Sequence, residues 1–167
     1  PALQLSEPVR IVCRENSIDS LLADLALHKI DLVIADGPVP AGINVRVYSH
    51  KLGDCGISFF AIDKLIEQMT GDFPHSLKTV PVLLPSDTNS VQSRLWKWFD
   101  THRIQPNIVG EFDDSALMKT FGQAGVGVFM APTPIAPEVE KQYGVKVIGQ
   151  TDEVHEQFYA ISAERKI

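Results

Sequence analysis

Apolar residues recur along this chain at helical spacing and at strand spacing in turn, and the alternation predicts its secondary structure. From Ile18 to Leu25 the apolar residues stand three or four positions apart, which is typical of one face of a helix. Asn16 or Ser17 is placed to cap this helix. We expect the helix to end near His28, where the apolar spacing stops.

A strand is predicted directly after this helix, because the residues from Ile30 to Ala35 form a nearly continuous apolar run. Such a run is typical of a strand covered on both faces in a parallel sheet. The loop that follows, residues 36–42, is rich in proline and glycine. Further strands are predicted at 9–13, 44–49, 56–61, 80–84, 107–112, 145–148 and 158–163, and further helices at 62–69, after the turn 86–90, after Asp113 or Asp114, and at 137–144.

Strands that alternate with helices predict an α/β fold with mainly parallel sheets and right-handed crossovers. Breaks near Gly56 and Thr133 indicate two Rossmann-like lobes. Lobe I is expected to contain residues 1–57 and 134–167, and lobe II residues 58–133. Because the chain would then cross between the lobes twice, we expect a hinged cleft.

The glycine-rich stretch GQAGVGV, residues 122–128, invites comparison with phosphate-binding loops. In those loops the glycines lie between a strand and the following helix. Here they follow a helix, expected to carry Leu117, Phe121 and Ala124 on one face, and they lead into a strand. We therefore expect Gly125 in the left-handed conformation past the helix end and Gly127 at the start of a buried run.

Composition narrows the possible functions. The 167 residues carry a net charge of −6, without the basic excess that nucleic-acid binding requires, so direct contact with nucleic acid is not expected from these residues. Cys13 and Cys55 stand far apart, which fits a reducing compartment such as the cytoplasm better than a disulfide scaffold. The apolar runs are shorter than a membrane span of ~20 residues, and no secretion signal is visible, so no membrane contact is expected.

Catalytic chemistry has little support in the pattern of residues. The five histidines are scattered without the spacing of metal ligands. Ser58 and Ser162 lie in apolar runs without the strained turn that exposes a nucleophilic serine. We therefore expect no enzyme activity and no bound cofactor.

The polar turn SDTNS is the strongest candidate binding segment. Its residues, Ser86, Asp87, Thr88, Asn89 and Ser90, stand between a predicted strand and a predicted helix. Open α/β sheets bind ligands at this position, past the carboxyl end of a strand. The alternative is that Thr88 or Asn89 only caps the helix while its neighbours are solvated.

The order of these segments resembles the effector-binding domain of LysR-type transcriptional regulators. The residues that carry the resemblance are LALHKIDLVI at 25–34, PNIVGE at 106–111 and AGVGVFMAP at 124–132. The resemblance implies a fold of the type 2 periplasmic-binding-protein kind, with a first strand and most of a first helix of lobe I preceding residue 1. The chain departs from the family pattern at His28, where glycine is common in the family.

The resemblance also implies where an effector binds. The SDTNS turn matches one wall of the family's cleft, and Asn16 and Ser17 match the opposite wall. Asp36 and Asp113, each at a strand's end, are expected to face the same space, unless they serve only as turn former and cap.

Within the family, the sequence most resembles activators of sodium/proton antiporter expression that respond to sodium. Three segments carry this resemblance: HKIDLVIAD, GEFDDSALMKTFGQAG and GQTDEVHEQFYAISAERKI. This implies Na⁺ or Li⁺ as the effector. Helix N-termini prefer anions, so a cation there needs several oxygen ligands, with Asp87 and Asp113 as candidates. A small organic anion stays open as the effector.

The resemblance further implies a homodimer or tetramer that binds promoter DNA through a winged helix-turn-helix outside these residues. The helix at 62–69 is a candidate dimer contact, although its apolar face fits an internal core equally well. A second interpretation, a solute-binding protein of the periplasmic type for a small polar or anionic ligand, shares the same architecture.

Overall fold

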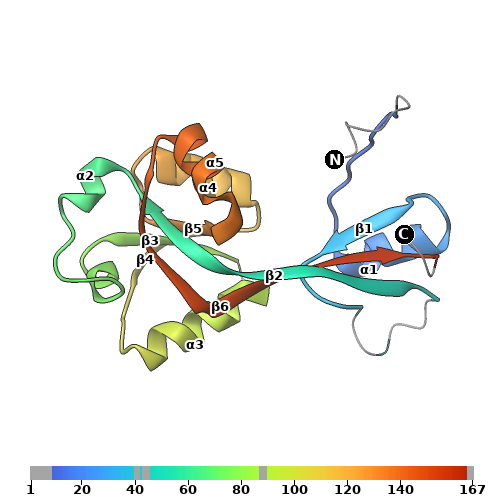
Figure 1. The fold of residues 1–167 in the computed structure, drawn as a ribbon, viewed down its shortest axis with the longest axis horizontal. Helices are drawn as coiled ribbons and strands as arrows, with labels where there is room; N and C mark the ends of the chain where they lie inside the picture. The colour runs from blue at the N-terminus through green and yellow to red at the C-terminus, as the bar shows by residue number, and fades with distance from the viewer. Residues whose placement is uncertain (1–8, 40–41, 43–45, 87–89, 165–167) are drawn as a thin grey trace.

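A computed structural model describes residues 9–39, 42, 46–86 and 90–164 of the chain. Figure 1 shows two bodies of unequal size that are joined by two long strands. The helices are α1 (Ile18–Ala26), α2 (Asp63–Ile66), η2 (His75–Lys78), α3 (Ser90–Thr101), α4 (Ser115–Gln123), η3 (Thr133–Ile135) and α5 (Ala136–Tyr143). The strands are β1 (Leu32–Ala35), β2 (Tyr48–Ala61), β3 (Pro81–Pro85), β4 (Asn107–Phe112), β5 (Phe129–Pro132) and β6 (Lys146–Ser162).

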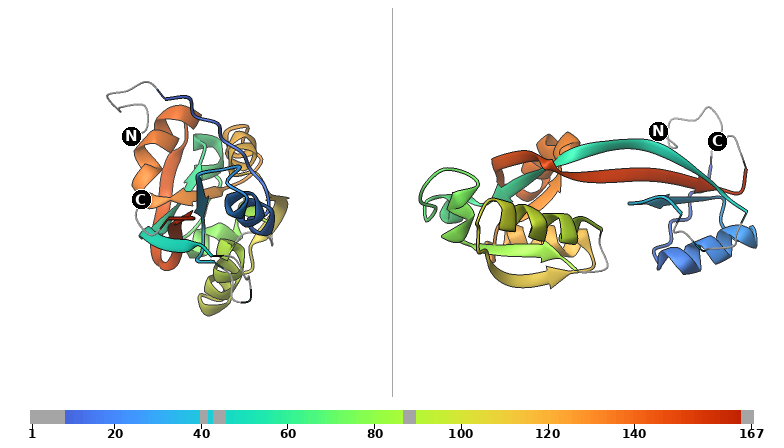
Figure 2. Two further views of the ribbon diagram at one scale, coloured as in Figure 1. Left: turned by 90° about the vertical axis from the view of Figure 1, so that its right-hand side faces the viewer. Right: turned by 90° about the horizontal axis from the view of Figure 1, so that it is seen from below.

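The two long strands β2 and β6 pair antiparallel along most of their length and form a ribbon that runs through both bodies (Figures 1 and 2). At one end β1 joins β6, and at the other β5 joins β2, so the order of this four-stranded sheet is β1-β6-β2-β5. We call the end with α1 and β1 the small body. The end with α2 to α5 and β3 to β5 is the large body.

The small body is organised by α1, which covers one side of β1. The Ser17 hydroxyl caps the helix by accepting a hydrogen bond from the backbone N–H of Ser20 at 3.4 Å, as the sequence predicts. At the other end His28 adopts a left-handed conformation, with φ of 54°. The N–H groups of His28 and Lys29 then close the helix on Leu25 and Asp24. The turn that glycine makes easily is thus made here by histidine.

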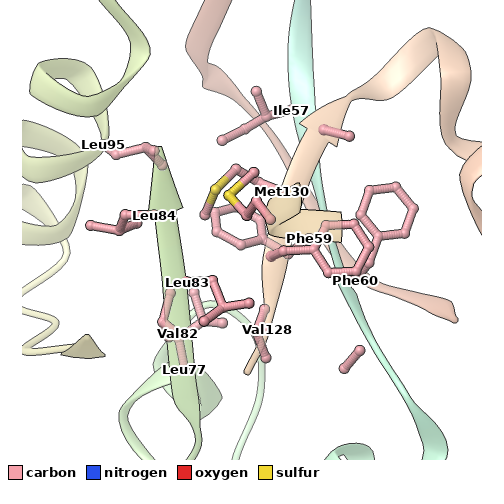
Figure 3. Close-up of a cluster of buried hydrophobic side chains, with 14 of the residues drawn as sticks. Ile57, Phe59, Phe60, Leu77, Val82, Leu83, Leu84, Leu95, Val128 and Met130 are labelled. Atoms are coloured by element: carbon pink, nitrogen blue, oxygen red, sulfur yellow. The ribbon is translucent and has the colours of Figure 1, made fainter. Parts of the chain in front are cut away.

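The large body contains the parallel part of the fold. β3 and β4 pair parallel, and a parallel bridge joins Val82 to Val128 beside them. Helices α3 and α4 follow β3 and β4 as the pattern predicts, and the Asp114 carboxylate caps α4 by accepting from the N–H groups of Ala116 and Leu117. Figure 3 shows the apolar side chains of β2, β3 and β5 that meet in the centre of this body.

The glycine-rich segment is structural, as predicted. Gly125 has φ of 79° and lies just past the end of α4, so it takes the left-handed turn. Gly127 is buried, and a Cβ there would lie 3.0 Å from the carbonyl oxygen of Pro81. The close approach of β3 therefore excludes a side chain at this position.

The predicted α/β class is confirmed, while the sheets are mixed. β1, β2, β5 and β6 pair antiparallel, and parallel pairing is confined to β3, β4 and the bridge at Val128. Residues 48–49 of the segment predicted at 44–49 and all of the segment 56–61 belong to one strand, β2, and residues 146–148 and 158–162 of the other two predicted strands belong to β6. Each crossing between the bodies is thus a continuous strand, where the sequence indicated a break.

Three predictions of local structure are wrong because tertiary packing differs from the pattern. Residues 9–13 form no strand, and Val12 is 63% exposed. β1 is covered on one face alone, which leaves Ile34 57% exposed. The helix predicted at 62–69 is one turn, α2, and its apolar residues pack on the core of the large body. The sequence grouped Leu117 and Phe121 on one face of α4 without deciding its burial, and the structure shows that this face is exposed while Met118 and Gly122 are buried.

Gly56 marks an irregularity in the ribbon between the bodies. On β2, Cys55 pairs with Glu156 and Ile57 with Thr151, so residues 152–155 of β6 lie in a bulge. A Cβ on Gly56 would lie 2.5 Å from the carbonyl oxygen of Thr151. The bulge therefore requires glycine here, and it turns part of β6 toward α3, with which β6 is in contact.

Candidate functional site

Asp36 connects the two bodies outside the ribbon. It follows β1 in the small body, and its carboxylate accepts a hydrogen bond at 3.2 Å from the backbone N–H of Ser90, the first residue of α3 in the large body. The first N–H groups of a helix lack partners within the helix and carry partial positive charge. The carboxylate therefore sits where that charge favours it.

Glu156 lies next to this contact, in the part of β6 that passes between the bodies. Its side chain is half-buried, and burial raises the pKa of its carboxyl group above the usual range. The negative charge of Asp36 raises that pKa further, whereas Lys119 and Arg94 lower it. The pKa of Glu156 on β6 thus responds to charged groups from the loop after β1, from α3 and from α4.

A second polar contact joins the carboxyl ends of β3 and β4. The Ser86 hydroxyl donates to the carboxylate of Asp113, and the Ser86 N–H donates to the carbonyl oxygen of Phe112 at 2.8 Å. These residues follow neighbouring parallel strands, so the edge where open α/β sheets bind ligands carries a hydroxyl and a carboxylate, as the sequence predicts.

The structure brings together part of the predicted set of binding residues. Asp36 meets Ser90, and Ser86 meets Asp113. The contacts of the other wall are local: the Asn16 side chain accepts from the N–H of Ser17, and Ser17 caps α1. Asp87, Thr88 and Asn89 lie outside the described residues, so their predicted roles as effector or sodium ligands stay predictions.

Sequence reasoning missed Glu156, which lies near Asp36, and the cationic residues that influence Glu156. Glu156, Arg94 and Lys119 belong to three different elements, and no motif links them. The sequence carried no signal at Glu156, because this residue falls between the predicted strands 145–148 and 158–163, and only the fold places it in the long strand β6. Arg94 and Lys119 stand at ordinary helix positions, and only the fold brings them near Glu156.

Helix α3 is held against the ribbon at two further points. Arg94 donates a hydrogen bond to the backbone carbonyl of His155 in the bulge of β6. At the far end of the helix the His102 ring lies 3.0 Å from the carboxylate of Glu153, also in the bulge. The position of α3 is therefore tied to the shape of β6 between the bodies.

The chemistry available at this site is binding. Within the described ranges, no group of three or more His, Cys, Asp or Glu side chains is arranged to hold a metal ion. The buried hydroxyl of Ser58 donates to the hydroxyl of Thr133 at 3.1 Å, so the partner it has among the described residues is a second hydroxyl and not a base that could activate it. What the site offers is carboxylates, backbone N–H groups and two cationic side chains, which suit a small polar or charged ligand.

A separate hollow of about 330 Å³ lies at the end of α3 away from Ser90. It is lined by Lys78, Asp100, Arg103, Ile104 and Gln105. Charges of both signs line it, and all of these side chains except Ile104 are exposed. None of the predicted binding residues that the structure describes lines it.

Comparison with known families identifies the family of this chain. The family model described as "LysR substrate binding domain" matches residues 5–166, nearly the whole chain. The chain belongs to the LysR substrate-binding domain family. The resemblance expected from the sequence is confirmed, and regulation of transcription, rather than catalysis, is what this LysR family does.

Known proteins place the chain within the LysR family. The transcriptional activator protein NhaR of Escherichia coli strain K12 is 35% identical over 161 residues, 96% of this chain and 52% of NhaR. The chain thus spans about half the length of the curated relatives it matches. The regulatory domain of HypT from Salmonella typhimurium, in its apo form, has a TM-score of 0.70 at 15% identity and covers 98% of this chain and 78% of that chain. DarR of Vibrio fischeri, solved in complex with DNA, also has a TM-score of 0.70 at 15% identity, and covers 92% of this chain and 52% of its own.

These findings define the chain as a LysR-type effector-binding domain similar to that of NhaR. The solved structures show the fold, an α/β regulatory domain with mixed sheets. As for membranes, none of the helices in the described part of the chain is both long and apolar enough to span one.

Proposed function

We propose that this domain senses Na⁺ or Li⁺ for a LysR-type activator of sodium/proton antiporter expression. The observation that carries the proposal is the 35% identity with NhaR over 96% of the chain. That identity lies well above the 15% shared with HypT and DarR. A cytoplasmic location follows from the proposed role.

The geometry supports a mechanism in which the two bodies change their relative position. We take the small body as lobe I and the large body as lobe II, with one crossing near residue 57 on β2 and the other within β6, after α5, which lies in the large body. β2 and β6 link them, and the bulge at Gly56 interrupts their regular pairing at the crossing. A ligand between the bodies that binds one arrangement more tightly shifts the population toward it. DNA-binding regions outside this chain would then meet the promoter differently.

A monovalent cation would find oxygen ligands on both sides of this region. Asp36 supplies a carboxylate from the small body and Glu156 lies near it on β6, while Asp113, at the end of β4, is a separate candidate, because the described side chains form no group of three that could hold a metal ion. Hard cations favour such oxygen shells. The partial positive charge at the start of α3 opposes a cation, so binding requires at least one of these carboxylates to turn toward the ion.

Thermal unfolding at fixed ionic strength tests the proposal. The purified protein is heated in NaCl, LiCl, KCl or choline chloride, with the total salt held constant so that general screening is equal. A site filled to about a hundred times its dissociation constant stabilises the protein by ~2.7 kcal/mol. We expect sodium and lithium to raise the midpoint, and Asp113→Asn to remove the rise. Equal midpoints in all four salts would refute direct sensing by this domain.

We also propose that the domain forms homodimers, and tetramers within the longer regulator. Support comes from α4, where Leu117 and Phe121 stand one turn apart and are 47% and 42% exposed. Exposed apolar residues that share a helix face are typical of interaction sites. Sedimentation of a Leu117→Ser/Phe121→Ser variant is expected to show a monomer, and Trp96→Ser, an exposed residue on α3, serves as the control.

An alternative is a domain that binds a small organic anion, as a solute-binding protein does. The observation that favours it is the contact at Ser90, where a carboxylate already occupies the start of α3 with Arg94 one turn away. The same unfolding experiment with a panel of small carboxylates distinguishes the two. A midpoint raised by one carboxylate and by no cation supports the alternative.

A further inference from the structure

The hydrogen bond between Asp36 and Ser90 has the features of a latch between the bodies. Its two residues are 54 positions apart in the chain, and they belong to different bodies. Asp36 leaves the end of β1 in a loop rich in proline and glycine, and Ser90 begins a helix that is anchored to β6 by Arg94 and His102. The contact therefore fixes α3 and the bulge of β6 relative to the small body.

The attraction at this contact is electrostatic and is open to competition. The backbone N–H of Ser90 and the partial positive charge of the helix start attract the Asp36 carboxylate. Glu156 repels it when ionised, because the charge of Asp36 and that of Glu156 interact unfavourably. Arg94 and Lys119 offset that repulsion in part. The hydrogen bond to Ser90 is exposed and lies beside a second carboxylate, so a ligand can compete for the Asp36 carboxylate.

We propose that Asp36 acts as a latch: without ligand, its carboxylate holds the small body against the start of α3 in the large body. A monovalent cation that binds this carboxylate breaks the contact and lets the two bodies separate. This second step rests on the proposed function. The helix start and the cation compete for the same oxygen atoms, since both carry positive charge. Binding of the ion therefore changes the position of α3 relative to the small body, and through Arg94 that of the β6 bulge, while the internal structure of each body stays the same.

Amide exchange of Ser90 tests the latch without any ligand. In the purified protein, in potassium buffer, exchange of the Ser90 N–H is followed by NMR for wild type, Asp36→Ala, Asp36→Asn and Asp31→Ala. Asp31 is the matched control, because it is an exposed carboxylate just before β1 in the same body. We expect Asp36→Ala to speed exchange about fivefold, the usual effect of losing a helix cap.

The conservative variant separates the latch from a general effect on folding. Asn keeps an acceptor oxygen but loses the charge, and charge-assisted bonds are about twice as strong as neutral ones. Asp36→Asn is therefore expected to fall between wild type and Asp36→Ala, while Asp31→Ala matches wild type. Unchanged Ser90 exchange in Asp36→Ala would overturn the proposal.

A distance measurement tests the effect on the two bodies. Spin labels are placed at Leu27→Cys, at the exposed end of α1, and at Lys97→Cys, on the exposed face of α3, with Cys13 and Cys55 replaced by Ser. In potassium, Asp36→Ala is expected to broaden the distance distribution and shift it to longer values, and Asp31→Ala to leave it unchanged. In wild type, sodium is expected to produce the same shift as Asp36→Ala.

The two measurements separate failure of the latch from failure of the proposed function. If Asp36→Ala alters Ser90 exchange and the distances while sodium does neither, the closed contact is real and sodium opening is overturned. If sodium raises the unfolding midpoint and Asp36→Ala leaves exchange and distances as in wild type, sodium sensing stands and the latch is overturned. Sodium that changes the distances of Asp36→Ala as much as those of wild type also overturns opening through Asp36.

Discussion

The small and large bodies differ most in how much apolar surface each buries. Among the described residues, the buried core of the small body consists of Leu22, Leu25, Val33 and Ile161, with partly buried residues around them. The core of the large body takes in residues from β2 through β6, including Phe59, Phe60, Phe99 and Phe129. Because hydrophobic stabilisation grows with the apolar area buried, the free energy of unfolding is distributed unevenly. The small body is the part that a ligand or a neighbouring chain segment can shift most readily.

The largest effects are expected from truncating one core residue in each body. Phe59 is fully buried and stacks on Trp98, with ring centroids 5.5 Å apart, so Phe59→Ala is expected to lower the free energy of unfolding by about 3–5 kcal/mol. Leu25→Ala in the small body is expected to cost about 2–5 kcal/mol locally. Hydrogen exchange distinguishes the two, because Leu25→Ala should expose amides of α1 and β1 while those of β3 and β4 stay protected. Uniform loss of protection in both variants would show that the bodies unfold as one unit.

The ribbon between the bodies provides the next test. Gly56→Ala forces its Cβ against the backbone of Thr151 and Asp152, and we expect a loss of about 1–3 kcal/mol from displaced backbone. Gly53→Ala, on the same strand, has open space around the new methyl group and is expected to change stability by less than about 0.5 kcal/mol. Urea unfolding of both variants measures the difference. Equal stabilities would show that β6 adjusts freely at the bulge.

The N-terminal caps of α4 in the large body and α1 in the small body are expected to contribute smaller differences in stability. The Asp114 carboxylate accepts two hydrogen bonds at the start of α4, at 2.7 and 3.2 Å, whereas Ser17 accepts one at 3.4 Å at the start of α1. We expect Asp114→Ala to cost about 1 kcal/mol and Ser17→Ala about 0.5 kcal/mol. Both values come from urea unfolding. A greater loss for Ser17→Ala would mean that α1 depends on its cap more than its hydrogen bond indicates.

His28 allows a gain of stability in the small body. Its left-handed conformation costs an L-residue roughly 1–2 kcal/mol, and glycine relieves this cost but adds about 0.4–1 kcal/mol of freedom to the unfolded chain. His28→Gly is therefore expected to stabilise the protein by about 0.5 kcal/mol. Gly125→Ala, at the matching turn in the large body, should do the reverse, since a Cβ there would meet the side chain of Ile62. The unfolding midpoints of the two variants should move in opposite directions.

The smallest expected effect is the pH dependence contributed by Glu156. Its folded-state pKa is raised, first by burial, so the folded protein disfavours the ionised form. The contribution to stability is fully present below the unfolded pKa of about 4.3 and is lost as the pH rises through the raised folded pKa. Glu156→Gln should therefore equal wild type in acid and exceed it at neutral pH. Parallel stability curves for the two proteins across this range would contradict the assignment.

Much of the local structure was predictable because its causes are local. Residues within a few positions of one another set the starts of α1 and α4 at Ser17 and Asp114 and the left-handed turn at Gly125. The pairing of β2 with β6 was beyond such reasoning, since it joins residues about a hundred positions apart. For the candidate site the same holds: position past a strand's end indicated Ser86, Asp36 and Asp113, while the contact between Asp36 and Ser90 depends on how the bodies meet.

The sequence by itself determined the family, the alternation of strands and helices, and the caps and turns. Each of these depends on neighbouring residues or on sequence similarity to relatives. Tertiary structure alone decided which apolar faces are buried, that the crossings are continuous antiparallel strands, and that Glu156 lies beside Asp36. Burial and charge interactions act through space, and their partners come from distant parts of the chain. A pattern along the sequence therefore shows which residues are apolar or charged, and only the fold shows what each one meets.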